Sequence, residues 1–240
     1  MLRFIRKLRN NAVMESNGNA YFKYAIGEII LVVVGILIAL QINNWNEYRK
    51  DRDFEHYILK EMVNNLRTDR SLIDGILVQR RLTQKALENM NRYIHNETIP
   101  IDTLERDLLE LITFERYFPI KTAYEVSKSN QMQITNEELR STLATFYETD
   151  IMILQSALKD LERAFLSDFK PFARDFLLSF SYKKKLDFKS YPDPQLTEAV
   201  RQILLTYTGN HSSTVHYIES FRERSIKVEE EVLEELKRFE

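Results

Sequence analysis

One acidic residue, Glu28, stands alone in an apolar run from Ala25 to Ile42 and is the residue best placed to do chemistry in a membrane. A carboxylate in such a run can carry a proton or an ion beside a channel-forming partner. Glu28 also lies about one and a half helical turns inside Phe22, so its side chain can instead reach the lipid headgroups or Lys23. A contact with another helix is the third interpretation. We favour the headgroup or packing role, then helix association, then ion coupling.

The four histidines do not have the spacing of a metal site. They are His56, His95, His211 and His216. The last two are five residues apart, so they do not share a helix face as an i, i+4 pair would, and no acid completes a metal-binding pattern beside them. The chain also lacks a G-x-S-x-G elbow, a phosphate-binding loop and a dinucleotide fingerprint. We therefore expect no catalytic residues, metal, cofactor or small-molecule substrate, and the sequence predicts that the protein is not an enzyme.

The composition is typical of a folded helical protein. Of the 240 residues, 44% are hydrophobic and 29% are charged, and only five are glycine and five are proline. Because glycine and proline interrupt helices, their scarcity predicts an all-α fold. The chain has no cysteine, which excludes disulfides, thiolate metal sites and a cysteine nucleophile. The part after the apolar run is mildly acidic, so nucleic acid is not an expected partner.

The apolar run has the length and the flanking residues of a transmembrane helix. With the flanking aromatic residues it reaches the roughly 20 residues that cross a bilayer, and interfacial aromatics stand at both ends as Tyr21, Phe22, Tyr24 and Trp45. A buried helix of a soluble protein would not need these aromatics. A signal peptide would have a shorter run and a small-x-small cleavage site, which is absent after Gln41. We expect a cytoplasmic tail at residues 1–22, a membrane helix at 23–44 and a separate domain at 45–240.

Basic residues concentrate before the apolar run. Arg3, Arg6, Lys7 and Arg9 are opposed there only by Glu15. The positive-inside rule then predicts a cytoplasmic N-terminus and a periplasmic domain at 45–240, with the protein anchored in the cell inner membrane.

One stripe of the membrane helix has the features of a helix-association face. Steps of four and three residues bring a set of side chains to the same side of the helix, and within it Gly35 and Ala39 form a small-xxx-small pair that lets two backbones approach closely. We expect a second copy of the chain, or another membrane protein, to pack there. The stripe consists of Glu28, Val32, Gly35, Ala39, Ile42 and Asn46.

The segment from Tyr24 to Glu47, YAIGEIILVVVGILIALQINNWNE, closely resembles the opening of an uncharacterised family of membrane-anchored proteins from Bacteroidota, a domain of unknown function. Weaker similarity to that family lies in Thr122–Glu125 and Ile134–Arg140. The last third of the chain does not share the resemblance. The resemblance implies an inner-membrane protein with a helical periplasmic part, and it implies no activity or catalytic residues.

Helical periodicity covers most of the chain beyond the membrane segment. No proline occurs from Tyr21 to His95, so the membrane helix is expected to continue into the following domain, where Asp69, Arg80 and Thr83 interrupt its apolar stripe. The rest is expected to complete an antiparallel helical bundle. Its predicted elements are a helix opened by a capping box at Asp102 and Glu105, a short helix at Thr122–Ser129, a long helix opened by a second capping box at Thr135 and Glu138, and a separate helical turn started by Pro171.

The C-terminal part is predicted to hold two helices. Asp193 before Pro194 is a helix start, and Gly209 is expected to end that helix in a left-handed cap. A last helix from Ser212 has apolar residues at near-heptad spacing and would close the bundle or pair with a second copy. Before these helices, the stretch YKKKLDFKSYPDP is expected to be a loop that exposes Lys183–Lys185, with contact to acidic lipid or a partner as the less favoured alternative. The phenylalanines around Pro171 are expected to pack in the core, and an exposed protein-binding or membrane-touching patch is the alternative.

Taken together, these features favour a membrane-anchored helical scaffold or accessory subunit that acts through protein–protein association in the cell envelope. The alternative is a stator-like or transport-coupling subunit in which Glu28 titrates. A periplasmic sensor is disfavoured, because roughly twenty cytoplasmic residues leave no room for an output domain.

Overall fold

The computed structural model describes residues 18–95, 99–129 and 134–239. The chain divides into two compact units, Met1–Phe54 and Glu55–Glu240. The basic residues before Gly18 and the side chain of Tyr21 lie outside the described residues. The predicted all-α fold is confirmed, with one small β-hairpin added to it.

Helix α2 spans Gly18–Ile94 without a break, as the absence of proline predicts. Its first part forms the described portion of the first unit, and its second part, from Glu55, is the first long helix of the second unit. Gly27, Gly35 and Gly75 lie inside this helix, and a Cβ added at any of them would meet nothing within 4 Å. No described part of the chain therefore requires glycine at these positions for close packing.

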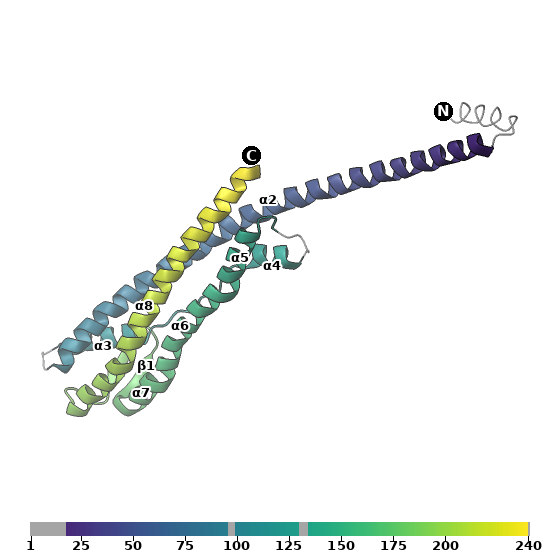
Figure 1. The fold of residues 1–240 in the computed structure, drawn as a ribbon. Helices are drawn as coiled ribbons and strands as arrows, with labels where there is room; N and C mark the ends of the chain where they lie inside the picture. Colours follow the sequence, from purple (N-terminus) through teal and green to yellow (C-terminus); the bar gives the residue numbers. More distant parts are fainter. Residues whose placement is uncertain (1–17, 96–98, 130–133, 240) are drawn as a thin grey trace. The chain divides into compact units, whose positions relative to one another are not determined.

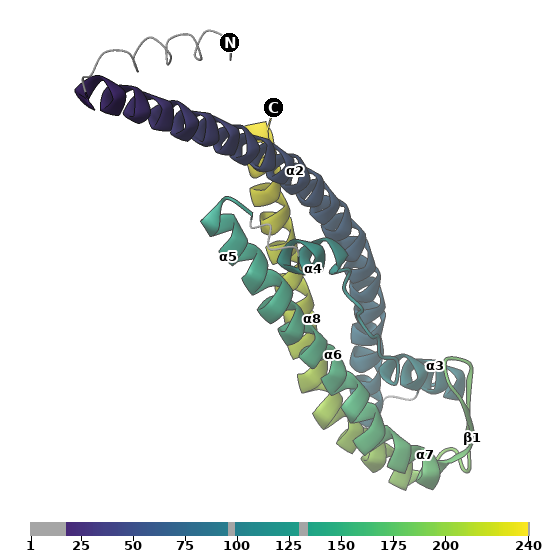
Figure 2. The same cartoon turned by 90° about the vertical axis from the view of Figure 1, so that its right-hand side faces the viewer.

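The second unit is built on three long helical stretches. Helix α8 runs antiparallel to α2, because Thr197 near its start bonds to Tyr93 (3.2 Å) and Glu229 near its end bonds to Arg67 (2.6 Å). It also runs antiparallel to the stretch that holds α6, because Thr214 donates to the Ala157 carbonyl (3.2 Å) and Arg224 farther along pairs with Asp150 (3.4 Å). Figures 1 and 2 both show α8 beside α6. The remaining bounds are α5 (Glu137–Thr145), α6 (Ile151–Ala164), α7 (Lys170–Phe176) and α8 (Pro194–Leu236), with a 3₁₀ turn at Lys237–Phe239.

Two π-helical turns join α5, α6 and α7 into one continuous stretch. They lie at Phe146–Asp150 and Phe165–Phe169. In the second turn the Lys170 N–H donates to the Phe165 carbonyl, so the helix continues up to Pro171 and past it. The prediction that Pro171 starts a separate helical turn is therefore wrong.

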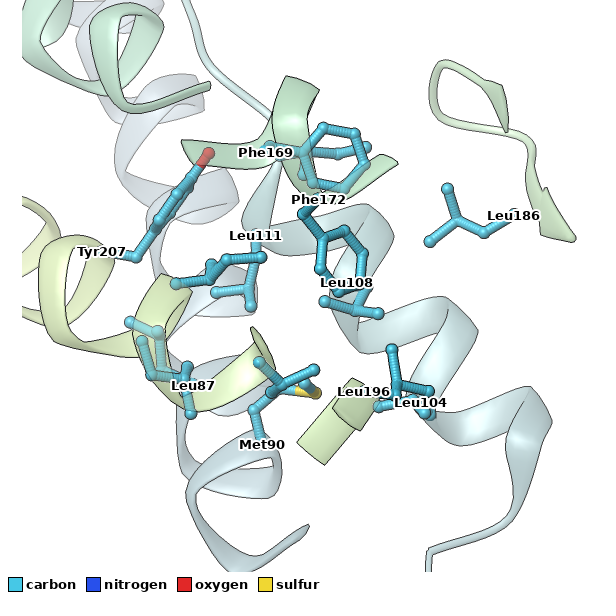
Figure 3. Packing of buried hydrophobic residues seen from close by; sticks show 14 of the residues in the cluster. Leu87, Met90, Leu104, Leu108, Leu111, Phe169, Phe172, Leu186, Leu196 and Tyr207 are labelled. Atoms are coloured by element: carbon cyan, nitrogen blue, oxygen red, sulfur yellow. The ribbon is translucent and has the colours of Figure 1, made fainter. Parts of the chain in front are cut away.

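The hydrophobic core at one end of this unit gathers side chains from α2, α3 (Ile101–Leu111), α6, the second π-helical turn, α7, residues 177–186 and α8 (Figure 3). Met90 of α2, Leu104 and Leu108 of α3, and Leu196 of α8 are fully buried there. Phe169 and Phe172 pack into the same cluster and Phe165 and Phe176 are partly buried against it, so the predicted core role is confirmed for these four phenylalanines. Phe180 is outside the cluster and is 37% exposed.

A β-hairpin takes the place of the loop expected before α8. Strands β1 (Leu177–Ser181) and β2 (Lys185–Phe188) pair antiparallel, with Phe180 opposite Leu186 and a bulge between Leu177 and Ser179. Lys183 adopts a positive φ of 59° in the turn. The turn carries no Asn-Gly or Asp-Gly pair, so the usual sequence signal for a hairpin is missing.

Neither predicted capping box forms, because the residues predicted to cap the two helices do not do so. Helix α3 begins after Pro100 with no side-chain cap, and Glu105 accepts a hydrogen bond from the Leu186 N–H (2.8 Å) in place of its own helix start. Helix α5 is capped by Asn136, which accepts from the N–H groups of Glu138 and Leu139. One residue of each predicted box binds a distant partner instead: Glu105 binds the Leu186 N–H, and Thr135 binds the carboxylate of Glu55.

Gly209 does not end a helix, which corrects the predicted break at that residue. Helix α8 passes through it, and buried residues continue on both sides as Tyr207, His211 and Thr214. Burial of this face offsets the roughly 1 kcal/mol that a glycine costs within a helix. The predicted start is confirmed, since Asp193 accepts from the Gln195 N–H (2.8 Å). The short helix α4 is also confirmed, at Thr122–Ser129.

Candidate functional site

The apolar part of α2 is the main candidate for a functional surface. Its large aliphatic side chains are exposed, from 42% for Ile26 to 70% for Leu31. Among the described residues, α2 is the one helix long and apolar enough to cross a membrane, and none of its apolar window is buried. From Phe22 to Ile42 the helix extends about 31 Å, close to the hydrocarbon thickness of a bilayer.

Aromatic and polar side chains mark the ends of this apolar surface. Phe22 and Tyr24 are exposed at one end and Trp45 at the other. Beyond Ile42 the side chains form local polar contacts, with Asn43 donating to Glu47 (3.1 Å) and Arg49 lying over the Trp45 ring at 5.6 Å. This order of apolar surface, aromatic residues and charge matches the order of environments across a membrane interface.

The structure places every residue of the predicted association stripe on one side of α2. Steps of four and three residues keep Glu28, Val32, Gly35, Ala39 and Ile42 within about 40° of one line along a helix. All five residues are exposed, and the space around Gly35 is open. The face is therefore available to a partner.

The second unit holds three buried polar residues that the sequence suggested would interrupt the apolar stripe of α2. Asp69, Arg80 and Thr83 are 3%, 1% and 1% exposed. Rather than weakening the packing, Asp69 and Arg80 bind the segment of irregular backbone at residues 113–121, between α3 and α4, which we call the connecting segment, and Thr83 binds the end of α3 just before it. Irregular backbone against a core must find hydrogen-bond partners outside regular structure, and side chains of α2 supply them.

Arg80 holds the start of the connecting segment. Its Nη2 donates to the Thr113 carbonyl (2.8 Å) and pairs with the Glu115 carboxylate (2.8 Å). Thr83 on the next turn donates to the Glu110 carbonyl at 3.4 Å. Because the guanidinium is almost completely removed from water, these partners are required to offset its desolvation.

Asp69 holds the other end of the connecting segment. Both of its carboxylate oxygens accept from the Ile120 N–H, at 3.1 and 3.2 Å. Burial raises the pKa of Asp69, and the hydrogen bond from Ile120 opposes that rise. Between the two anchors, Gln155 of α6 donates to the Tyr117 carbonyl (3.1 Å), so a second helix also fixes the segment.

Tyrosines pack around the Asp69 end at the first π-helical turn. Tyr124 of α4 stacks on Tyr147 of the turn, with ring centroids 4.6 Å apart. The Tyr147 carbonyl accepts from Lys121 Nζ at 2.9 Å. The pKa values of Tyr117 and Tyr147 are raised well above the ordinary value, mainly because the phenols are buried. Both phenols are therefore protonated at neutral pH.

His211 of α8 is buried in this unit, at 4% exposure, and its two ring nitrogens have no hydrogen-bond partner among the described residues. Burial, and then the positive charge of Arg80, lowers the pKa of His211 to about 4. The side chain is therefore neutral at pH 7. His216 is exposed on another side of the helix, as the five-residue spacing predicts.

Sequence reasoning missed the role of Asp69 and Arg80. The sequence did contain one indication of this role. Asp69 and Arg80 are 11 residues apart, which is close to three helical turns, so the two charged side chains lie on one face of the helix. Among the described residues, no three His, Cys, Asp or Glu side chains are grouped so that they could hold a metal ion.

Comparison with known families identifies one match. Residues 28–166 match the model of a family described as "Family of unknown function (DUF6090)". The matched range begins at Glu28 and contains the association stripe and the connecting segment with its two anchors. No curated protein and no solved structure matches the chain.

Replacing Arg80 should destabilise the second unit far more than replacing its neighbour. Arg80→Met leaves the Thr113 carbonyl and the Glu115 carboxylate without their cation, and we expect a loss of about 3 kcal/mol in the free energy of unfolding. Arg81→Met, at an exposed position, should change it by less than about 0.5 kcal/mol. Urea unfolding of the full chain in detergent, followed by circular dichroism, measures both, and equal effects would contradict the assigned role.

Stability should fall in acid because of His211. Its pKa is about 4 when folded and 6.5 when unfolded, so the unfolded chain binds more protons between these values. The free energy of unfolding should therefore drop as the pH falls from about 6.5 to about 4, by at most about 3 kcal/mol. His211→Leu should remove this part of the pH dependence, whereas His216→Leu should keep it. A wild-type profile that coincides with that of His211→Leu would contradict the account.

Proposed function

Since this chain belongs to that family of unknown function, we propose that it is a membrane-anchored helical scaffold or accessory subunit acting through protein–protein association in the cell envelope. The observation that carries the proposal is the exposed apolar surface of α2, which lies in the same chain as a well-packed helical unit. The apolar surface anchors the chain in a lipid bilayer. The second unit supplies the surface for partners outside the lipid.

The proposed location is the inner membrane of a bacterial cell, with the N-terminus in the cytoplasm and residues 45–240 in the periplasm. The four basic residues in the first ten positions support this orientation, because short basic segments are retained on the cytoplasmic side. The resemblance of Tyr24–Glu47 to membrane-anchored proteins of Bacteroidota supports the same location.

The association stripe is the proposed contact between membrane helices. In lipid, helices gain little from burying apolar side chains against each other, so close packing at small residues and polar contacts determine which faces meet. Gly35 and Ala39 supply the small residues in the middle of the stripe. The partner is a second copy of the chain or another membrane protein.

A pair of glycine variants tests this contact. We expect Gly35→Leu to lower crosslinking between membrane helices at least about five-fold, which corresponds to roughly 1 kcal/mol of lost packing. Gly27→Leu makes the same chemical change about 80° away around the helix and should leave crosslinking within two-fold. Neither glycine contacts another described part of the chain, so neither change should disturb the fold.

The readout is disulfide crosslinking in native membranes. Because the chain has no cysteine, Asn46→Cys introduces a single thiol on the same stripe just beyond the apolar run. Equal crosslinking of the two glycine variants would contradict association through this face. If a different protein is the partner, a thiol-to-amine crosslinker attached to the Asn46→Cys thiol should trap it, and that product should show the same dependence on Gly35.

Glu28→Gln separates the scaffold from the stator-like alternative. Glutamine keeps the size and hydrogen-bonding capacity of the side chain but cannot carry a proton. We expect normal insertion and crosslinking, and full complementation of cells that lack the gene, because a packing or headgroup role does not require ionisation. Loss of complementation with unchanged insertion and crosslinking would instead support ion coupling through Glu28.

A further inference from the structure

The β-hairpin of the second unit carries a basic tip in a mildly acidic domain. Lys183, Lys184 and Lys185 are consecutive and exposed at the turn, and they form the longest basic run after residue 44. One of them is neutralised, because Lys185 pairs with Asp187 (2.6 Å). The other two leave a local positive charge at the tip.

An aromatic side chain is exposed at the turn, and an apolar side chain is exposed at the other end of β1. Leu178 lies at the bulge in β1 and is 72% exposed, and Tyr182 at the start of the turn is 41% exposed. Hairpin residues on the other face serve the core, since Leu186 is 2% exposed. Leu178 is therefore a surface residue that no core packing requires.

Several contacts hold the hairpin firmly on the bundle. The Leu186 N–H donates to Glu105 of α3 (2.8 Å), and the Lys189 N–H donates to the Phe176 carbonyl (2.9 Å). Lys189 Nζ also donates to the carbonyls of Arg174 and Asp175. The exposed tip is thus presented by a fixed support, which lowers the entropy lost on binding.

The hairpin lies at the end of the second unit away from Glu55. It contacts α3, which follows the last turn of α2, and Leu186 packs in the same cluster as Met90. The opposite end of the unit is marked by His56 stacked on Phe239, with ring centroids 5.0 Å apart. Thirty or more residues of α2 separate these two ends, a distance on the order of 50 Å.

We propose that the hairpin tip binds the surface of a bilayer that contains anionic lipid. Lys183 and Lys184, the two lysines without a carboxylate partner in the hairpin, attract the negative headgroups, each by about 1 kcal/mol. Tyr182 at the turn and Leu178 farther along β1 then lie in the interface, where an amphipathic ring and an apolar side chain are favourable. A soluble polyanion would use the lysines but would gain nothing from Leu178, and the apolar residue therefore favours lipid as the ligand.

Vesicle capture tests the proposal with the full chain. The protein is placed in nanodiscs of zwitterionic lipid, and capture of phosphatidylglycerol-containing vesicles is compared with capture of pure phosphatidylcholine vesicles. We expect selective capture of the anionic vesicles. Replacing Lys183, Lys184 and Lys185 together with serine should weaken it about 100-fold. The assay needs no assumption about which partner the membrane helix has, so its outcome is independent of the proposed scaffold role.

The matched control replaces three dispersed, exposed lysines, Lys60, Lys85 and Lys159, with serine. It removes the same net charge and keeps the same N-terminal basic segment, so it should retain capture within about three-fold. Circular dichroism checks that all variants are folded. Equal capture by the two triple variants, or equal capture of both vesicle types by the wild type, would overturn the proposal.

Leu178→Ser separates lipid from other anions. If the tip binds a bilayer, this variant should lose capture several-fold while its dependence on salt stays unchanged. If Leu178→Ser captures anionic vesicles as well as the wild type does, and polyglutamate competes with those vesicles, the ligand is a polyanion and the assignment to lipid is overturned.

Discussion

The apolar surface of α2 has to be removed from water, and the proposed anchoring of the protein depends on that constraint. Twelve large aliphatic side chains are exposed from Ile26 to Ile42. Transferring them to an apolar phase is favourable on the order of 20 kcal/mol, which exceeds the roughly 5–15 kcal/mol that holds a typical domain folded. No described part of the chain covers them. A bilayer is the phase that fits this helix in length and in its aromatic ends.

Buried polar contacts organise the second unit. The connecting segment has no regular structure, yet it lies against the core because Asp69 and Arg80 of α2 bind its two ends. Glu55 does the same for Thr135, accepting from both its N–H and its hydroxyl at 2.7 Å. Burying these charges is costly, so their partners must stay in place. The same low-polarity interior keeps His211 neutral beside Arg80 and couples the stability of the bundle to pH.

The sequence predicted the features that depend on local pattern. The unbroken helix through α2, the start of α8 at Asp193 and the helix at Thr122–Ser129 follow from periodicity, proline placement and caps. The errors lie where tertiary contacts decide. Thr135 and Glu105 bind distant partners instead of capping helices, and packing on both sides of Gly209 carries α8 through it. From the sequence, Asp69 and Arg80 only interrupt an apolar stripe. Their role could not be predicted, because the segment that they bind is more than thirty residues away in the sequence.

The apolar surface of α2, the small-residue stripe on it and the firmly supported bundle are the features on which the proposed role in the cell envelope rests. The most direct test of the anchor compares Leu37→Cys with Leu72→Cys, two similarly exposed residues of the same helix in an otherwise cysteine-free chain. In opened membranes, a water-soluble maleimide should label Cys at 72 rapidly and leave 37 unlabelled until detergent is added. Equal labelling of both sites in membranes, or recovery of the intact chain in the soluble fraction, would contradict the account.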